Sequence, residues 1–114
     1  ALLDPDQIQR LLLNLLINAA DAQGGNGKII VRLEDGEGTW RMDVMDQGPG
    51  VDPALRDRIF QPFFSTKKQG SGLGLAQARQ TALAHGGSLR VVENPAGGSV
   101  FMLELPTQVR QETR

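Results

Sequence analysis

Cysteine is absent from the 114 residues of this sequence, which excludes a disulfide framework and a thiolate metal site. An excess of charge of one sign is also missing, because 12 basic and 13 acidic residues leave a formal net charge of −1. This balance gives no excess of positive charge that would bind nucleic acid or an acidic membrane surface. Long apolar runs are missing too, since the run LLLNLLI is short and contains an asparagine. We therefore expect no nucleic-acid partner, no membrane span and no direct membrane contact.

The length of the chain suits one domain with a sizeable core. No signal peptide is visible, and the sequence opens at ALLDPDQ without an initiator methionine, as expected of a piece of a longer protein. We predict one domain over residues 1–106 and a polar, flexible tail over residues 107–114.

Helical periodicity predicts two long helices. In the first, apolar residues recur at helical spacing over residues 8–22, between the start signal Asp4-Pro5 and the stop signal Gly24-Gly25. The second is predicted over residues 75–85 and ends at a pair of glycines.

Alternating apolar and polar residues predict two hairpins. KIIVRLE and TWRMDVMD flank the turn DGEG, and SLRVVEN and GSVFMLELP flank the turn PAGG. Between the hairpins we predict a short helix from Pro53 to about Ile59, capped by Asp52, and then a loop over residues 60–72.

This order of elements favours an α+β fold, a two-layer α/β sandwich in which helices stack on one face of a single sheet. Trp40, Met42 and Val44 share one face of a predicted strand and are expected in the core.

The stretch GSGLGLAQ, residues 70–77, places three glycines before a predicted helix. Glycine-rich turns that open helices often bind phosphate, because backbone N–H groups and the helix dipole point at the anion. The stretch matches neither the dinucleotide fingerprint nor the Walker P-loop, so by itself it is weak evidence and a mobile linker is the safer interpretation.

Asn14 and Asn18 lie four positions apart on one face of the first predicted helix, and Asp21 continues that face. Amide oxygens are suitable hard ligands for Mg²⁺, although two semi-exposed polar residues are the plainer alternative.

Asp46 ends a predicted strand and is followed by a glycine-rich turn. It is either an ordinary turn aspartate or a carboxylate that accepts a hydrogen bond from an exocyclic amine.

Lys67 and Lys68 are either solvated charges or phosphate contacts. His85, the single histidine, is expected to be a helix C-terminal residue that suits the dipole and not a catalytic one.

Five ordered motifs from about residue 4 to residue 106 resemble one known family. NLLINAADA, DQGPGVD, RIFQPFFSTK, GSGLGLAQ and AGGSVFMLEL are similar to the N, G1, F, G2 and G3 boxes of histidine-kinase catalytic domains. These domains belong to the GHKL superfamily, with gyrase, a heat-shock chaperone and the MutL-type mismatch-repair ATPases. The form PFFSTK…GSGLGLA looks most like the nitrogen-regulation type of two-component sensor kinase.

The resemblance implies a Bergerat ATP-binding fold, with a mixed, mostly antiparallel sheet and a flexible lid over the nucleotide. It implies that ATP binds with Mg²⁺, that Asn18 is the metal ligand and that Asp46 accepts the adenine amino group. Asn14 and Lys67 are the residues it assigns to catalysis, while Phe60, Phe63 and Phe64 would anchor the start of the lid. The full set of residues that the resemblance assigns to the nucleotide is Asn14, Asn18, Asp21, Asp46, Gly48, Gly50, Val51, Phe60, Thr66, Lys67, Gly70, Ser71, Gly72, Leu73, Gly74, Leu75 and Ser99.

ATP-hydrolysing members of the superfamily carry a glutamate four residues before the metal-binding asparagine. Here that position is Asn14, which cannot act as a general base near neutral pH. The resemblance therefore favours transfer of the γ-phosphoryl group to a protein acceptor, which needs positioning and charge neutralisation above all.

In this family the acceptor histidine belongs to a separate dimerisation and phosphotransfer domain of the same parent chain, with a response regulator as the downstream partner. We expect the isolated domain to be monomeric and cytoplasmic, and the sequence leaves open whether its parent is anchored in a membrane. Leu2-Leu3 is expected to be the remnant of a missing strand or hairpin, which would leave an unpaired sheet edge.

Two alternatives to this function remain: a stand-alone serine kinase of the anti-sigma type, and an interaction module that no longer binds nucleotide.

Overall fold

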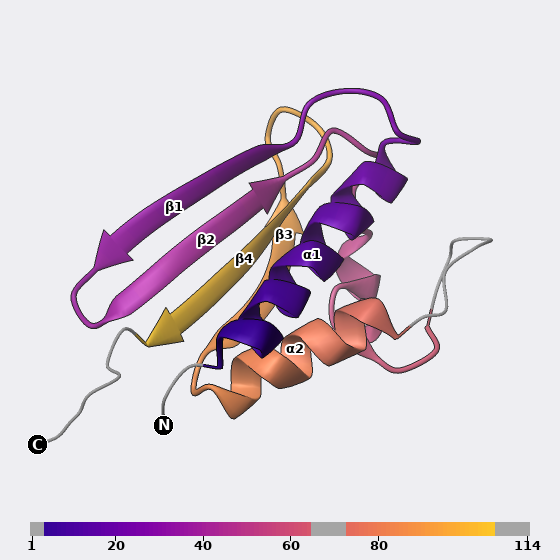
Figure 1. Ribbon diagram of the computed structural model, residues 1–114. Helices are drawn as coiled ribbons and strands as arrows, with labels where there is room; N and C mark the ends of the chain where they lie inside the picture. The colour runs from indigo at the N-terminus through magenta and orange to yellow at the C-terminus, as the bar shows by residue number, and fades with distance from the viewer. Residues whose placement is uncertain (1–3, 65–72, 107–114) are drawn as a thin grey trace, which may run out of the picture.

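Two helices lie on one face of a four-stranded sheet in this computed structural model, which describes residues 4–64 and 73–106 (Figure 1). The helices are α1 (Pro5–Ala22) and α2 (Gly74–Ala84), and the strands are β1 (Ile30–Gly36), β2 (Thr39–Met45), β3 (Ser88–Glu93) and β4 (Ser99–Pro106). The strand order is β1-β2-β4-β3. The two-layer α/β sandwich is confirmed, and all three pairings among the described strands are antiparallel, where a mixed sheet was expected.

Helix α1 begins and ends at the predicted signals. The Asp4 carboxylate accepts hydrogen bonds from the backbone N–H groups of Asp6 and Gln7, and Pro5 occupies the first helical position. After Ala22 the chain turns through Gly24 and Gly25, both in the left-handed region that glycine adopts without strain.

The predicted short helix is two separate 3₁₀ turns, η1 (Pro53–Leu55) and η2 (Arg58–Phe60). Their backbone bonds join residues three positions apart, because neither segment is long enough to close the four-residue bonds of an α-helix. Asp52 caps η1 as predicted, through its side-chain oxygen and the N–H of Ala54.

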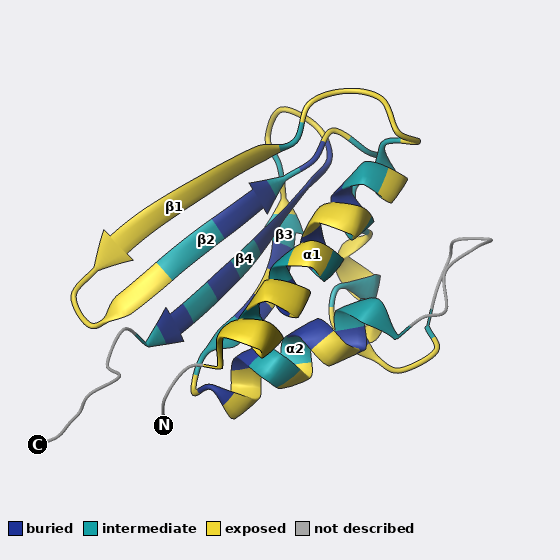
Figure 2. Ribbon diagram, in the orientation of Figure 1, coloured by how far each residue is buried: buried dark blue, intermediate teal, exposed yellow. Residues whose placement is uncertain are grey.

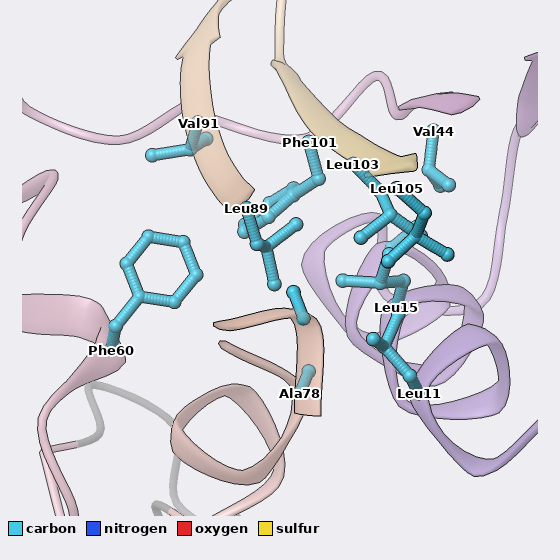
Figure 3. Close-up of a cluster of buried hydrophobic side chains, with 12 residues drawn as sticks. Leu11, Leu15, Val44, Phe60, Ala78, Leu89, Val91, Phe101, Leu103 and Leu105 are labelled. Carbon is cyan, nitrogen blue, oxygen red and sulfur yellow. The ribbon is translucent and has the colours of Figure 1, made fainter. Parts of the chain in front are cut away.

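The hydrophobic core lies between the helices and the inner sheet face (Figure 3). Leu11 and Leu15 of α1 point toward the β4 side chains, and the edge of Phe60 meets the ring of Phe101 with the ring centres 6.1 Å apart. Small side chains on α2, such as Ala78, allow the two helices to pack closely.

The β1–β2 hairpin reaches beyond the cover of the helices, so its side chains are more exposed than the alternation suggests (Figure 2). Val44 is buried and Met42 packs at the margin of the core, but Trp40 is 41% exposed. The prediction that Trp40 lies in the core is therefore wrong. Its strand position gives the correct face, but no helix covers that end of the sheet.

The outer sheet face carries an ion pair between neighbouring β2 side chains. The guanidinium of Arg41 donates from Nε and Nη2 to the two carboxylate oxygens of Asp43, at 3.2 and 3.3 Å. This hydrogen bond, reinforced by the charge of Asp43, raises the pKa of Arg41 above its ordinary value. Arginine is already protonated at accessible pH, so the shift adds no pH dependence to stability.

His85 joins the beginning of α1 to the end of α2. Its Nδ1 lies 2.7 Å from the carbonyl oxygen of Thr81, and its Nε2 accepts a hydrogen bond from the backbone N–H of Asp4 at 3.0 Å. The two partners assign the ring proton to Nδ1. The residue caps the helix end as expected, yet it is 6% exposed and acts as a structural bridge more than as a partner of the dipole.

Candidate functional site

Asp46 follows the last residue of β2 and is almost completely buried, at 1% exposure. Its carboxylate oxygen Oδ1 accepts hydrogen bonds from the backbone N–H groups of Gly48, at 2.9 Å, and Ser99, at 3.2 Å. Its second oxygen, Oδ2, is buried and has no hydrogen-bond partner within the described residues. A buried acceptor without a donor is costly, so this oxygen indicates a ligand that supplies one.

Glycines around Asp46 bring the backbone close to it. A Cβ atom on Gly98 would lie 2.1 Å from the carbonyl oxygen of Asp46, and one on Gly48 would lie 2.6 Å from the carbonyl oxygen of Ala22. Gly50 has a positive φ of +85° and faces the Gly98 carbonyl. A side chain at these positions would displace the backbone around the carboxylate, which explains the glycines near Asp46 in both the G1 and the G3 motifs.

The beginning of α2 lies against α1 at Asn14. The Asn14 side-chain amide donates to the carbonyl oxygen of Gly74 at 3.2 Å. In the described part of the chain no side-chain hydrogen bond caps α2, and its first turn carries no acidic residue. Such a helix start favours an anion, in contrast to α1, whose first N–H groups are already satisfied by Asp4.

Asn18 and Asp21 lie further along the helix face that carries Asn14. Asn18 is half-buried and Asp21 is exposed in the last turn. No cluster of three or more His, Cys, Asp or Glu side chains that could hold a metal exists among residues 4–64 and 73–106. A Mg²⁺ ion in this region would therefore have few protein ligands, and phosphate oxygens and water would complete its coordination.

Other predicted contacts fall in different surroundings. Ser99 begins β4; its carbonyl oxygen accepts from the Asp46 N–H, and its own N–H donates to the Asp46 carboxylate. Val51 and Leu75 are partly buried against the core. Phe60 belongs to the core itself and carries the guanidinium of Arg79 over its ring.

The aromatic residues at the start of the expected lid differ from one another. Phe60 is anchored, and the half-buried Phe64 lies under the guanidinium of Arg58. Phe63 is 76% exposed with a positive φ of 67°, so it anchors nothing within the described part of the chain, contrary to expectation.

Several predicted residues lie outside the described residues: Leu2, Leu3, Thr66, Lys67, Lys68, Gly70, Ser71, Gly72 and the tail over residues 107–114. Leu73 and Gly74, which follow Gly72, are described and start α2.

Gln23 and Asn94 were missed at the sequence level. Asn94, in the β3–β4 turn, donates from Nδ2 to the carbonyl oxygen of Asp46, and Gln23, at the end of α1, accepts from the N–H of Gln47. The only sequence signal was their place beside glycine-rich turns, where polar residues are common for other reasons.

A buried carboxylate with one oxygen unpaired among the described residues, close-packed glycines and a helix start without an acidic residue in its first turn are features that suit a nucleotide-binding α/β sandwich. The chain belongs to the family of histidine kinase-, DNA gyrase B- and HSP90-like ATPases, whose model matches residues 3–109. Membership implies an ATP site, and the residues around Asp46 fit the base of such a nucleotide.

Similar curated proteins include sensor kinases of two-component systems. The chain is 38% identical over 109 residues to the sensor histidine kinase ZraS of Escherichia coli K12, an alignment that covers 96% of the chain and 23% of ZraS. It is 44% identical over 109 residues to the sensor protein TorS of the same organism, covering 93% of the chain and 12% of TorS. The chain thus spans about a quarter or less of these relatives.

Solved structures agree with the fold. A mycobacterial sensor histidine kinase, MprB, superposes with a TM-score of 0.84 at 40% identity, covering 90% of this chain and 72% of that one. The catalytic domain of the histidine kinase ThkA gives a TM-score of 0.84 at 39% identity, covering 94% of this chain and 69% of that one. The α/β sandwich is therefore that of a histidine-kinase catalytic domain.

In residues 4–64 and 73–106 no helix combines the length and the apolar character needed to cross a membrane.

Proposed function

We propose that this domain binds ATP with Mg²⁺ and supplies the γ-phosphoryl group to a histidine on a separate dimerisation domain of a two-component sensor kinase. The observation that carries the proposal is the buried Oδ2 of Asp46, which has no hydrogen-bond partner among the described residues. The exocyclic amine of adenine is a donor of the right kind for this oxygen, whereas the carbonyl group of guanine is a second acceptor. A solved relative, full-length ShkA in complex with AMPPNP, superposes with a TM-score of 0.77 at 34% identity and adds support.

The phosphates are proposed to lie at the start of α2. The absence of an acidic residue from its first turn, Asn14 beside Gly74 and the helix dipole favour negative charge there. Leu73, Gly74 and Leu75 would contribute backbone N–H groups. Thr66, Lys67, Gly70, Ser71 and Gly72 are proposed to close over the phosphates, by the resemblance of the motifs that contain them.

Asn18 is proposed as the protein ligand of Mg²⁺, which neutralises phosphate charge when bound. Asn14 holds the start of α2 by its amide, and an amide cannot activate water as a general base. This chemistry favours positioning for transfer over hydrolysis. The phosphate acceptor, the response regulator and a membrane-anchored or cytoplasmic parent belong to the same proposal, because the chain spans only part of its relatives.

Calorimetric titration with ADP in the presence of Mg²⁺ tests the proposal. The wild-type domain is expected to bind ADP, and Asn18→Ala is expected to lose most of the Mg²⁺-dependent part of the affinity. Gln9→Ala is the matched control, because the exposed Gln9 lies nine positions before Asn18 and so on the opposite side of α1.

Asn18→Asp is a second variant in case Asn18→Ala does not fold. It retains a side-chain oxygen that can bind the metal, so it is expected to keep Mg²⁺-dependent ADP binding. Absence of ADP binding by the folded wild-type domain would contradict the nucleotide proposal. Equal affinities of wild type and Asn18→Ala at every Mg²⁺ concentration would remove the metal role of Asn18.

A further inference from the structure

One peptide group, between Asp46 and Gln47, is held by two side-chain amides from distant parts of the chain. The Gln47 N–H donates to Oε1 of Gln23 at 2.6 Å, and the Asp46 carbonyl oxygen accepts from Nδ2 of Asn94 at 3.2 Å. Gln23 follows the last turn of α1, and Asn94 lies in the turn between β3 and β4. The N–H and the carbonyl oxygen of this peptide group are therefore both bound by side chains. Neither takes part in the backbone pairing between strands.

The orientation of each amide is determined by a second backbone partner. Nε2 of Gln23 donates to the carbonyl oxygen of Asn26 at 2.9 Å, which leaves Oε1 to accept from Gln47. Oδ1 of Asn94 accepts from the N–H of Ala96 at 3.1 Å, which leaves Nδ2 to donate to Asp46. Each side chain thus faces one donor and one acceptor, and exchange of its oxygen and nitrogen would break both bonds.

These contacts restrict Asp46 on both sides of its Cα atom. The Asp46 N–H donates to the carbonyl oxygen of Ser99 at 3.0 Å, and the following peptide group is held by Gln23 and Asn94. Oδ1 is bound by two backbone N–H groups, so Oδ2 has one direction available. The 46–47 peptide group also connects Asp46 to Gly48, whose N–H binds Oδ1, so a rotation of this group would displace one of the two donors that orient the carboxylate.

We propose that Gln23 and Asn94 are positioning residues for base recognition: by holding the 46–47 peptide group they aim Oδ2 of Asp46 at the exocyclic amine of the nucleotide. The inference rests on the proposed nucleotide function. It adds two residues that do not touch the nucleotide and act through Asp46.

The two sites require opposite hydrogen-bonding roles. Position 23 must supply an acceptor to Gln47, whereas position 94 must supply a donor to Asp46. The amide-to-acid replacements Gln23→Glu and Asn94→Asp each keep the shape and add one negative charge. Gln23→Glu retains the acceptor for Gln47 and loses the bond to the Asn26 carbonyl, which lies away from Asp46. Asn94→Asp places an acceptor against the Asp46 carbonyl oxygen itself. Equal charge changes are therefore expected to give unequal results.

The experiment compares ADP with inosine diphosphate, which has a carbonyl group in place of the amine, by calorimetry with Mg²⁺ present. The wild-type domain is expected to prefer ADP by about tenfold or more, the range for a hydrogen bond to a charged group. Asn94→Asp is expected to lower this preference several-fold while the affinity for inosine diphosphate stays within about twofold. Gln23→Glu is expected to keep the wild-type preference.

Gln23→Met removes the acceptor and is expected to lower the preference less than Asn94→Asp, because the Gln23 bond is exposed and water can replace it. Asn94→Ala removes the donor without adding charge and repeats the test if Asn94→Asp does not fold. A folded Asn94→Ala domain with the full preference for ADP would overturn the role of Asn94.

Other outcomes separate the inference from the function beneath it. Equal losses for both nucleotides in Asn94→Asp would show a general structural role and overturn the inference. Equal effects of Gln23→Glu and Asn94→Asp would do the same. A wild-type domain that binds ADP and inosine diphosphate equally well would overturn the inference and leave nucleotide binding intact, whereas failure to bind either would remove the proposed function itself.

Discussion

Gly98 shows how a single residue controls the environment of Asp46. It has a φ of +98°, and a Cβ atom there would lie 2.1 Å from the Asp46 carbonyl oxygen and 2.9 Å from Oδ1. Its neighbour Gly97 has a similar φ of +105°, but a Cβ atom there would meet nothing within 4 Å. The two glycines therefore share the backbone conformation and differ in the contact with Asp46.

Gly98→Ala is expected to destabilise the domain and to weaken ADP binding by tenfold or more, about the worth of one hydrogen bond to a charged group, because the methyl group displaces Asp46. Gly97→Ala carries only the backbone strain, about 1–3 kcal/mol for a left-handed non-glycine residue, and is expected to keep the ADP affinity. Urea unfolding and calorimetry measure the two effects. Identical ADP affinities in the two variants would show that the close approach of Gly98 is unimportant for the site.

At the scale of elements, α2 is tied to α1 near both of its ends. Asn14 bonds the Gly74 carbonyl at the beginning of α2, and His85 at its end accepts from the Asp4 N–H. The core between the helices adds small, fully buried side chains such as Ala78 and Ala82. The start of α2, where the phosphates are proposed to bind, is thus fixed relative to the asparagine face of α1.

Removal of the His85 bridge tests this arrangement. His85→Ala is expected to lower the free energy of unfolding by about 1–3 kcal/mol, because the Asp4 N–H and the Thr81 carbonyl lose their side-chain partner. Leu83→Ala is the control on the same helix, since Leu83 is exposed and its truncation should cost less than about 0.5 kcal/mol. Equal midpoints of urea unfolding for the two variants would argue against the bridge.

Elements also show where periodicity succeeds and fails. The spacing of apolar residues in α1 predicted both the helix and its buried stripe, because a helix exposes one face wherever it packs. Alternation in β1 predicted the strand but not its exposure, since β1 lies at the sheet edge with no helix over it (Figure 2). The position of Trp40 was misjudged for the same reason.

At the scale of the whole molecule, the chain contains nucleotide-binding motifs but only one histidine. Both ring nitrogens of His85 are engaged with backbone groups, and the residue is buried. Its imidazole is therefore poorly placed to attack a phosphorus atom, which is consistent with the proposal that the phosphate acceptor lies on a separate domain.

We predict that the chain, incubated with γ-labelled ATP and Mg²⁺, acquires no acid-labile label of the phosphohistidine type. A sensor-kinase dimerisation domain added in trans serves as the acceptor control. An acid-labile label that disappears in His85→Gln would contradict the prediction and make His85 an acceptor.

The order of helices and hairpins, the caps at Asp4 and Asp52 and the five nucleotide motifs were all determined by the sequence itself, because each depends on residues close together along the chain. The tertiary structure alone decided what surrounds Asp46. Among the described residues its Oδ2 has no partner. The contact with Gly98, the bond from Ser99 and the bonds of Gln23 and Asn94 to one peptide group join residues 24 to 53 positions apart. Such contacts depend on how the sheet, the turns and α1 pack together, and side-chain amides carry no periodic signal that would reveal their partners beforehand.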